Sequence, residues 1–276
     1  IDVPAGDIGV GGREVSYMFA MYKNLTHEYG GVLTGKGVGF GGSLMRTEAT
    51  GYGAVYFLEN MLTAQNDDIK GKRVLVSGAG NVSLHAAEKA HMLGGIVVTV
   101  SDSQGTLYDE AGLNQEKIDW LKAQKAKSKP LAEYVDVYGG EWFAKQKPWQ
   151  FKGDIAIPSA TQNEVNEEDA KLMVENGITY VVEGANMPLT AEAIDYIRLH
   201  RVHYAPGKAA NAGGVAVSAL EMSQNSVRQY KSFEQIDLRL KNIMRNIHDC
   251  AADASEQYGQ TDNGYINYMA GANIVG

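Results

Sequence analysis

The glycine turn at residues 78–83 constrains the fold more than any other segment of this chain. Gly78-Ala79-Gly80-Asn81-Val82-Ser83 follows the short apolar run 74–76 and leads into a helical pattern that ends at the glycines 94–95. The first glycine permits a tight turn, and the second lets a diphosphate approach backbone N–H groups at the positive end of a helix. Ser83 is small and stands where a third glycine is usual. The unit predicts dinucleotide binding, although turns of this length also occur with a purely structural role.

Apolar runs and helical periodicities alternate along most of the chain. Strands are predicted at residues 74–76, 96–100, 154–157, 180–182 and 202–204. Helices are predicted at residues 13–24, 47–64 with Thr47 as N-cap, 86–93, 116–128, 170–174 and 191–199, and mainly helix from 214 to about 258. Strands that alternate with helices pair in parallel through right-handed crossovers. The pattern therefore predicts an α/β fold, a doubly wound Rossmann-like sheet with flanking helices.

Composition excludes several classes of function. The net charge of −8 argues against nucleic acid as the main partner, because phosphate binding needs a basic surface. No apolar stretch approaches the ~20 residues that span a bilayer, so no membrane association is expected. The single cysteine, Cys250, cannot form an internal disulfide, which favours a reducing compartment and a cytoplasmic location. The six histidines show no metal-ligand spacing, and no metal site is expected.

The region after the second predicted strand bears on the choice of cofactor. Asp102 lies 24 residues after Gly78, where a carboxylate often holds the ribose 2′-OH of NAD. Ser103, however, is able to donate to a 2′-phosphate. A basic run follows at Lys122, Lys125, Lys127 and Lys129. Runs of this kind more often form a solvated helix face than a phosphate site.

Other polar residues stand beside glycines. Asp7 lies in a glycine-flanked turn, and Arg46 and Thr50 share one face of a helix. From spacing alone, these are a turn residue and an ordinary polar surface. Asn211 opens the loop 211–214, which is expected at the point where the strand order of the sheet reverses, a usual position for ligands.

Taken together, the motifs resemble the hexameric glutamate dehydrogenases, the bacterial NADP-specific members in particular. The blocks that carry the resemblance are DVPAGDIGVGGRE (2–14), TGKG (34–37), GGS (41–43), RTEATGYG (46–53), ATQNE (160–164), EGANMP (183–188), APGKAANAGGV (205–215) and GANI (271–274). The resemblance implies reversible oxidative deamination of L-glutamate to 2-oxoglutarate and ammonia. The block 101–103 and Lys125 resemble NADP-preferring bacterial members, so NADP is the expected cofactor and NAD the alternative.

The resemblance also implies a role for individual residues. Asp7 would be the catalytic carboxylate that moves protons to and from the amine. The substrate-binding residues would be Ser218, at the distal carboxylate, and Val215. The cofactor-binding residues would be Arg46, Thr50, Gly78, Gly80, Asn81, Val82, Asp102, Ser103, Lys125, Asn186 and Asn211.

Members of this family carry a lysine-bearing substrate domain ahead of the position of Asp2. We therefore expect residues 1–42 to be the C-terminal remnant of that domain and residues 43–276 to be the dinucleotide-binding domain with a C-terminal helical segment. The expected parent is a homohexamer, and the fragment itself is expected to have little or no turnover. Two alternatives stay open: a leucine, phenylalanine or valine dehydrogenase, and a non-catalytic nucleotide-binding protein.

Overall fold

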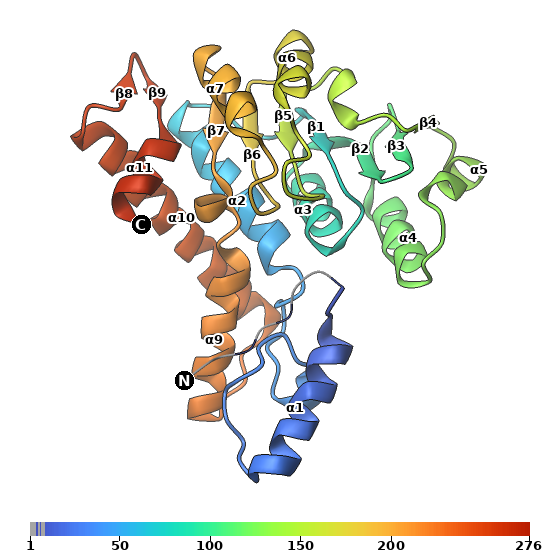
Figure 1. Cartoon of the computed structure of the whole chain (residues 1–276), viewed down its shortest axis with the longest axis vertical. Helices are drawn as coiled ribbons and strands as arrows, with labels where there is room; N and C mark the ends of the chain where they lie inside the picture. The colour runs from blue at the N-terminus through green and yellow to red at the C-terminus, as the bar shows by residue number, and fades with distance from the viewer. Residues whose placement is uncertain (1–3, 5, 7–8) are drawn as a thin grey trace.

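A seven-stranded sheet forms the centre of the computed structural model, which describes residues 4, 6 and 9–276. The strand order is β4-β3-β2-β1-β5-β6-β7 (Figure 1). The strands are β1 (Arg73–Val76), β2 (Ile96–Asp102), β3 (Gly105–Tyr108), β4 (Glu141–Ala144), β5 (Ile155–Ile157), β6 (Tyr180–Val182) and β7 (His203–Ala205). Five neighbouring strands, from β2 to β7, pair in parallel, which confirms the predicted fold class.

The strand order reverses beside β1. Helix α3 (Asn81–Met92) connects β1 to β2, and β2 pairs with one side of β1. Later in the chain, β5 pairs with the other side of β1. In open α/β sheets, ligands bind beyond the carboxyl ends of the strands at such a reversal. The segments that leave the carboxyl ends of β1 and β5 begin at Ser77 and Pro158, so these loops mark the position of the expected ligand site.

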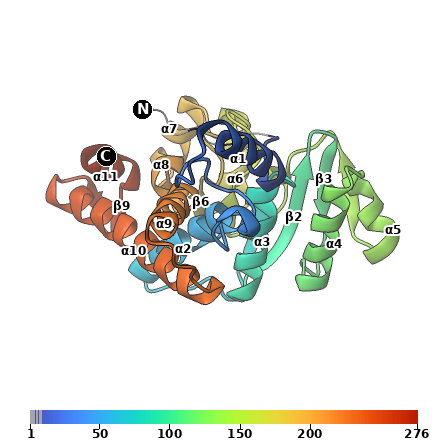
Figure 2. The same ribbon diagram turned by 90° about the horizontal axis from the view of Figure 1, so that it is seen from below.

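Helices cover both faces of the sheet and form two hydrophobic clusters. Because successive side chains of a strand point to opposite faces, Val74 and Val76 join one cluster and Leu75 joins the other. The first cluster lies under α2 (Ala49–Ala64), α3 and α10 (Phe233–Gln257). The second lies under α6 (Glu167–Glu175) and α7 (Ala191–Leu199). Figure 2 shows α4 (Gln115–Ala126) and α5 (Tyr134–Tyr138) at one end of the molecule and α10 with α11 (Tyr268–Val275) at the other.

A smaller lobe lies away from the sheet. It consists of α1 (Gly12–Thr26), the loop with the short helix η1 (Val38–Phe40) and the second half of α9 (Gly213–Val227) (Figure 1). Val15, Phe19 and Leu33 form its own hydrophobic cluster. Because α9 begins beside the short helix α8 (Gly207–Ala210) and ends in this lobe, it joins the lobe to the sheet.

Several elements differ from the sequence prediction. β3 and β4 were not predicted; they pair antiparallel with each other, and β3 pairs antiparallel with β2, so the sheet is mixed at this edge. β4 has no fully buried residue, which leaves no strong apolar pattern to recognise. The small hairpin of β8 (Thr261–Asp262) and β9 (Tyr265–Ile266) and helix α11 were also missed. Thr47 is not an N-cap: α2 follows Glu48, and no side chain caps it.

Gly51 in α2 allows α2 and α3 to touch through their backbones. A Cβ at this position would lie 2.5 Å from both the amide nitrogen of Ala86 and the carbonyl oxygen of Val82. We therefore expect Gly51→Ala to lower the free energy of unfolding by about 2 kcal/mol, because crowding exceeds the gain in helix propensity. Chemical denaturation of the variant measures this change.

The matched control for this substitution is Gly39→Ala. A Cβ on Gly39 meets no atom within 4 Å, so its stability should stay within about 0.5 kcal/mol of the original. Equal stability of the two variants would contradict the tight packing of α2 on α3.

Candidate functional site

The glycine turn after β1 has the geometry of a diphosphate cradle. Gly78 adopts φ +83°, in the left-handed region that favours glycine, and its N–H donates to Ser101 Oγ at 3.0 Å. A Cβ on Gly78 would lie 2.8 Å from the Ser159 carbonyl oxygen. Gly80 is the N-cap of α3 without a side-chain cap, and a Cβ there would meet no atom within 4 Å. Open space therefore adjoins the uncapped N-terminus of α3, as anion binding at a helix N-terminus requires.

The loops after β1 and β5 are tied together at this turn. Ser77 Oγ donates to Glu164 Oε1 at 2.8 Å and accepts from the Ser159 N–H at 2.9 Å. The same Glu164 oxygen accepts from the Ala160 N–H at 2.9 Å. Burial raises the pKa of Glu164, and the hydrogen bonds that it accepts oppose this rise. Glu164 was not among the predicted site residues, because nothing in its spacing shows that it reaches Ser77.

Two predicted residues, Asn186 and Asn211, are brought together at the next two strands. Asn211 Nδ2 donates to Asn186 Oδ1 at 2.8 Å and to the Ala185 carbonyl oxygen at 3.1 Å. The N–H groups of Gly184 and Ala185 both donate to the Pro158 carbonyl oxygen, at 2.9 and 3.0 Å. The amide pair therefore stands beside the β5 loop, on the same edge of the sheet as the glycine turn.

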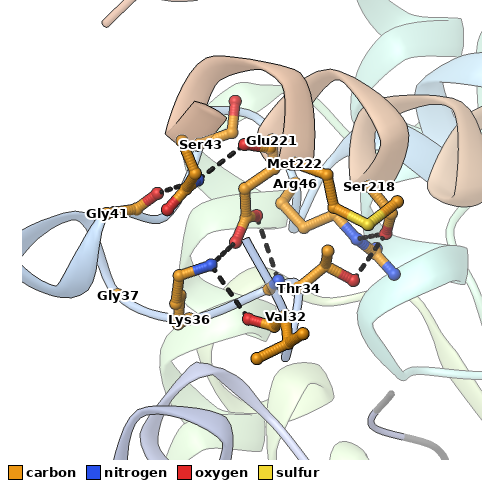
Figure 3. A network of polar contacts seen from close by, with 12 residues as sticks. Val32, Thr34, Lys36, Gly37, Gly41, Ser43, Arg46, Ser218, Glu221 and Met222 are labelled. Carbon is orange, nitrogen blue, oxygen red and sulfur yellow. Dashed lines mark hydrogen bonds and ion pairs between the residues drawn. The ribbon is translucent and has the colours of Figure 1, made fainter. Parts of the chain in front are cut away.

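A second group of polar residues surrounds the first turns of α9. Arg46 Nε donates to Ser218 Oγ at 2.8 Å, and Thr34 Oγ1 donates to the same oxygen at 3.0 Å (Figure 3). Because Ser218 accepts both bonds, its own hydroxyl hydrogen is left to donate elsewhere. Arg46 takes part in no ion pair within the described part of the chain, and burial lowers its pKa. Thr50 lies next to Gly214 at the start of α9. The group offers donors to an anion.

A buried ion pair joins Lys36 to Glu221, which follows Ser218 on α9. Lys36 Nζ and Glu221 Oε1 are 2.8 Å apart, and the exposed fraction of both side chains is 0% (Figure 3). Glu221 Oε2 accepts from the Gly35 N–H at 3.0 Å, and Lys36 Nζ also donates to the Val32 carbonyl oxygen at 3.3 Å. Sequence reasoning missed this pair because 185 positions separate its members.

The basic run that begins on α4 and continues past its end divides into paired and free lysines. Lys122 forms an ion pair with Glu88 at 2.7 Å, and Lys129 Nζ lies 3.6 Å from Glu133. Lys125, in the last turn of α4, has no carboxylate partner among the residues that the structure describes. Of the predicted run, Lys125 is therefore free to meet an anion whereas Lys122 is not.

The Asp102 carboxylate accepts hydrogen bonds from the backbone of its own turn. Its Oδ1 accepts from the N–H of Gln104 at 2.8 Å and from that of Gly105 at 3.3 Å, which closes the hairpin between β2 and β3. The spacing rule that predicts NAD assumes a carboxylate directed at the ribose. Here one oxygen of Asp102 serves the hairpin instead, and Ser103 is exposed at its tip.

The remaining predicted residues are placed as follows. Asp7 lies outside the described residues. Val215 is 69% exposed on the first turn of α9, and Asn81 Nδ2 donates to the Thr47 carbonyl oxygen at 2.5 Å. Val82 is half-buried beside it. In the described part of the chain, no group of three or more His, Cys, Asp or Glu side chains could hold a metal ion. No helix there is long and apolar enough to cross a membrane.

The parallel sheet, the reversal of strand order at β1 and the glycine cradle define a dinucleotide-binding domain of the Rossmann type. Residues 41–276 match the Glutamate/Leucine/Phenylalanine/Valine dehydrogenase family, and the chain belongs to this family.

Individual relatives agree with this assignment. The chain is 80% identical to an NADP-specific glutamate dehydrogenase of a Psychrobacter species, over 100% of this chain and 62% of that protein. It is 52% identical to an NAD-specific glutamate dehydrogenase of Bacteroides fragilis, over 100% of this chain and 62% of that protein. The crystal structure of Plasmodium falciparum glutamate dehydrogenase superposes with a TM-score of 0.95 at 44% identity, over 99% of this chain and 58% of that one. The chain thus spans about three fifths of the length of these relatives.

Breaking the buried ion pair should destabilise the protein strongly. Lys36→Met leaves the Glu221 charge buried without a partner, so we expect the free energy of unfolding to fall by about 3–5 kcal/mol. The double variant Lys36→Met/Glu221→Met should recover most of this loss, because two apolar side chains replace the two charges. Chemical denaturation measures both.

Lys171→Met is the matched control, because Lys171 pairs with Glu167 and Glu168 on an exposed helix face. It should change stability little. A Lys36→Met variant as stable as this control would show that the buried pair does not hold the loop of residues 34–36 to α9.

Proposed function

We propose that this chain is the cofactor-binding portion of a glutamate dehydrogenase. The reaction converts L-glutamate, NADP⁺ and water to 2-oxoglutarate, ammonium, NADPH and a proton, and runs in both directions. The observation that carries the proposal is the position of two donor sets near the start of α9: the Asn211 amide pair just before it and the Arg46–Ser218 group on its first turns. The first set suits a dinucleotide and the second suits an anionic substrate.

The Arg46–Ser218 group fits the distal carboxylate of glutamate. The free hydroxyl hydrogen of Ser218 and the terminal nitrogens of Arg46 are donors, and a carboxylate accepts such charge-assisted bonds strongly. An apolar side chain would leave these half-buried donors without acceptors, which disfavours the leucine, phenylalanine or valine alternative. A non-catalytic nucleotide-binding protein has no evident need for the group.

In the proposed reaction, a bound nicotinamide cofactor would supply the hydride chemistry at the α-carbon. This chain's residues bind and orient the two reactants. Gly78, Gly80 and the first turn of α3 would hold the diphosphate, and Thr50 and Arg46 would lie beside the nicotinamide. Asp7 would exchange protons with the amine and with water.

NADP is the proposed cofactor. Asp102 accepts two bonds from its own hairpin, and Ser103 and the free Lys125 are available to a 2′-phosphate. The NADP-specific relative at 80% identity supports this assignment, whereas the relative at 52% identity is named NAD-specific.

The rest of the proposal concerns the longer protein. Because the chain spans 62% of its 80% identical relative, we infer that turnover requires parts of a longer enzyme, and that this chain alone binds cofactor with little turnover. A homohexameric parent, a cytoplasmic location, and a boundary between residues 42 and 43 are proposed on the same likeness. Robust NADPH-dependent amination of 2-oxoglutarate by this chain alone would contradict the proposed lack of turnover.

Cofactor choice is tested with Lys125 and Lys122 of α4. Lys125→Ala should weaken NADPH binding by about tenfold and leave NADH binding unchanged, because one charge-assisted contact to a phosphate is lost. Fluorescence titration of both cofactors measures this.

Lys122→Ala is the control, since Lys122 is paired with Glu88 and should not discriminate between the cofactors. A larger loss of NADPH affinity in Lys122→Ala than in Lys125→Ala would overturn the assignment of Lys125. Negligible affinity of the unmodified chain for both cofactors would undercut cofactor binding itself.

Substrate choice is tested with Ser218→Ala in a longer enzyme that contains this chain. The kcat/KM for glutamate should fall by about 10- to 100-fold, because a hydrogen bond to a charged group is lost. The kcat/KM for norvaline, which lacks the distal carboxylate, should change little. Equal losses for the two amino acids would show that Ser218 does not recognise that carboxylate.

A further inference from the structure

Glu183 is a buried carboxylate without a cation. It follows β6 directly, its exposed fraction is 3%, and it takes part in no ion pair among the described residues. Taking a carboxylate out of water without a partner is unfavourable, so its retention needs compensating hydrogen bonds. Burial raises the pKa of Glu183, and hydrogen bonds from Gly207, Tyr204 and Leu189 oppose this rise.

These hydrogen bonds join three segments of the cofactor site. Glu183 Oε2 accepts from the Gly207 N–H at 2.6 Å, and Oε1 accepts from the Leu189 N–H at 3.4 Å. Gly207 begins the single-turn helix α8, and Leu189 closes the loop that starts after Glu183. Tyr204 comes from the neighbouring strand β7. Glu183 therefore fixes the start of α8 against the end of β6.

The orientation of Asn211 depends on the start of α8. The Asn211 N–H donates to the Gly207 carbonyl oxygen at 2.8 Å, so one helical turn separates Glu183's contact from Asn211. The Asn211 side chain then returns to the β6 loop at Ala185 and Asn186. The contacts close a ring that runs from Glu183 through Gly207 and Asn211 to Asn186 and back along the chain.

The ring is tightly packed around Gly207. A Cβ on Gly207 would lie 2.9 Å from the Ala185 carbonyl oxygen, 3.2 Å from Glu183 Oε2 and 3.3 Å from Asn211 Nδ2. Within the described residues, Asn211 Oδ1 and Asn186 Nδ2 have no hydrogen-bond partner. The ring thus holds one free acceptor beside one free donor, the complement of a primary carboxamide.

We infer that Glu183 is a positioning residue that holds Asn186 and Asn211 ready for the nicotinamide half of the dinucleotide. The inference rests on the proposed cofactor function. Glu183 itself touches no ligand atom in this arrangement and acts through Gly207 and Asn211. A residue that only stabilises the β6–α8 junction would affect all ligands alike, whereas a positioning residue affects the nicotinamide half alone.

The experiment compares two ligands of this chain by calorimetric titration. NADPH has the nicotinamide half, and adenosine 2′,5′-bisphosphate lacks it. Glu183→Gln replaces one of the two carboxylate oxygens with an NH₂ group, so the side chain can no longer accept from Gly207 and Leu189 on separate oxygens, and the ring is weakened. We expect about a tenfold loss of NADPH affinity, as for a displaced hydrogen-bonding pair, with the affinity for adenosine 2′,5′-bisphosphate unchanged.

Two further variants make the result decisive. Gly207→Ala keeps Glu183 but crowds the ring, and it should show the same loss confined to NADPH; it decides the question if Glu183→Gln does not fold. Glu192→Gln, an exposed residue in the first turn of the nearby helix α7, is the matched control and should leave both affinities unchanged.

Equal losses for both ligands, or no loss in a folded variant, would overturn the positioning role. Failure of the unmodified chain to bind either ligand would instead overturn the proposed cofactor function. The two failures are therefore distinguishable.

Discussion

The close approach of four loops at the carboxyl edge of the sheet is the constraint on which the site depends. Ser101 holds the Gly78 N–H, Ser77 and Glu164 hold the β5 loop, and the Pro158 carbonyl oxygen holds the β6 loop. The Glu183 carboxylate then holds the start of α8. Side chains and backbone thus bond each loop to its neighbour, so the position of one loop fixes that of the next. A ligand that spans this edge meets a surface that is already ordered.

Helix α9 joins the smaller lobe to this edge, and a buried ion pair holds the loop of residues 34–36 against that helix. Ser218 and Glu221 are three residues apart on α9 and share a face, so Thr34, Gly35 and Lys36 bind them in succession. The contact that fixes Lys36 therefore also fixes the distance between the lobe and Ser218. A buried pair is a weak source of stability, but the loss of one member leaves the other charge buried without a partner.

The sequence predicted the parts of the structure that have local signals. The strands buried on both faces appear as apolar triplets, and the glycine turn is recognisable because its strand and helix are contiguous. Helix α7 was predicted at its observed limits, residues 191–199. The edge strands β3 and β4 were missed, because a short strand with one exposed face has little apolar pattern. The buried contacts of Glu183, Glu164 and Lys36 depend on partners that the fold brings from distant positions, and no spacing rule reveals them.

An acidic chain that binds a polyanionic cofactor must control its charges locally, and three means are visible here. Glu221 is neutralised by Lys36, and Glu88 by Lys122. Burial raises the pKa of Glu164 and of Glu183 beside the ligand edge, and the hydrogen bonds that each carboxyl accepts oppose this rise. By contrast, the cations Arg46 and Lys125 are left without carboxylate partners in the described part of the chain. The net charge of −8 therefore says little about the local field at the site, where Arg46 and Lys125 supply positive charge.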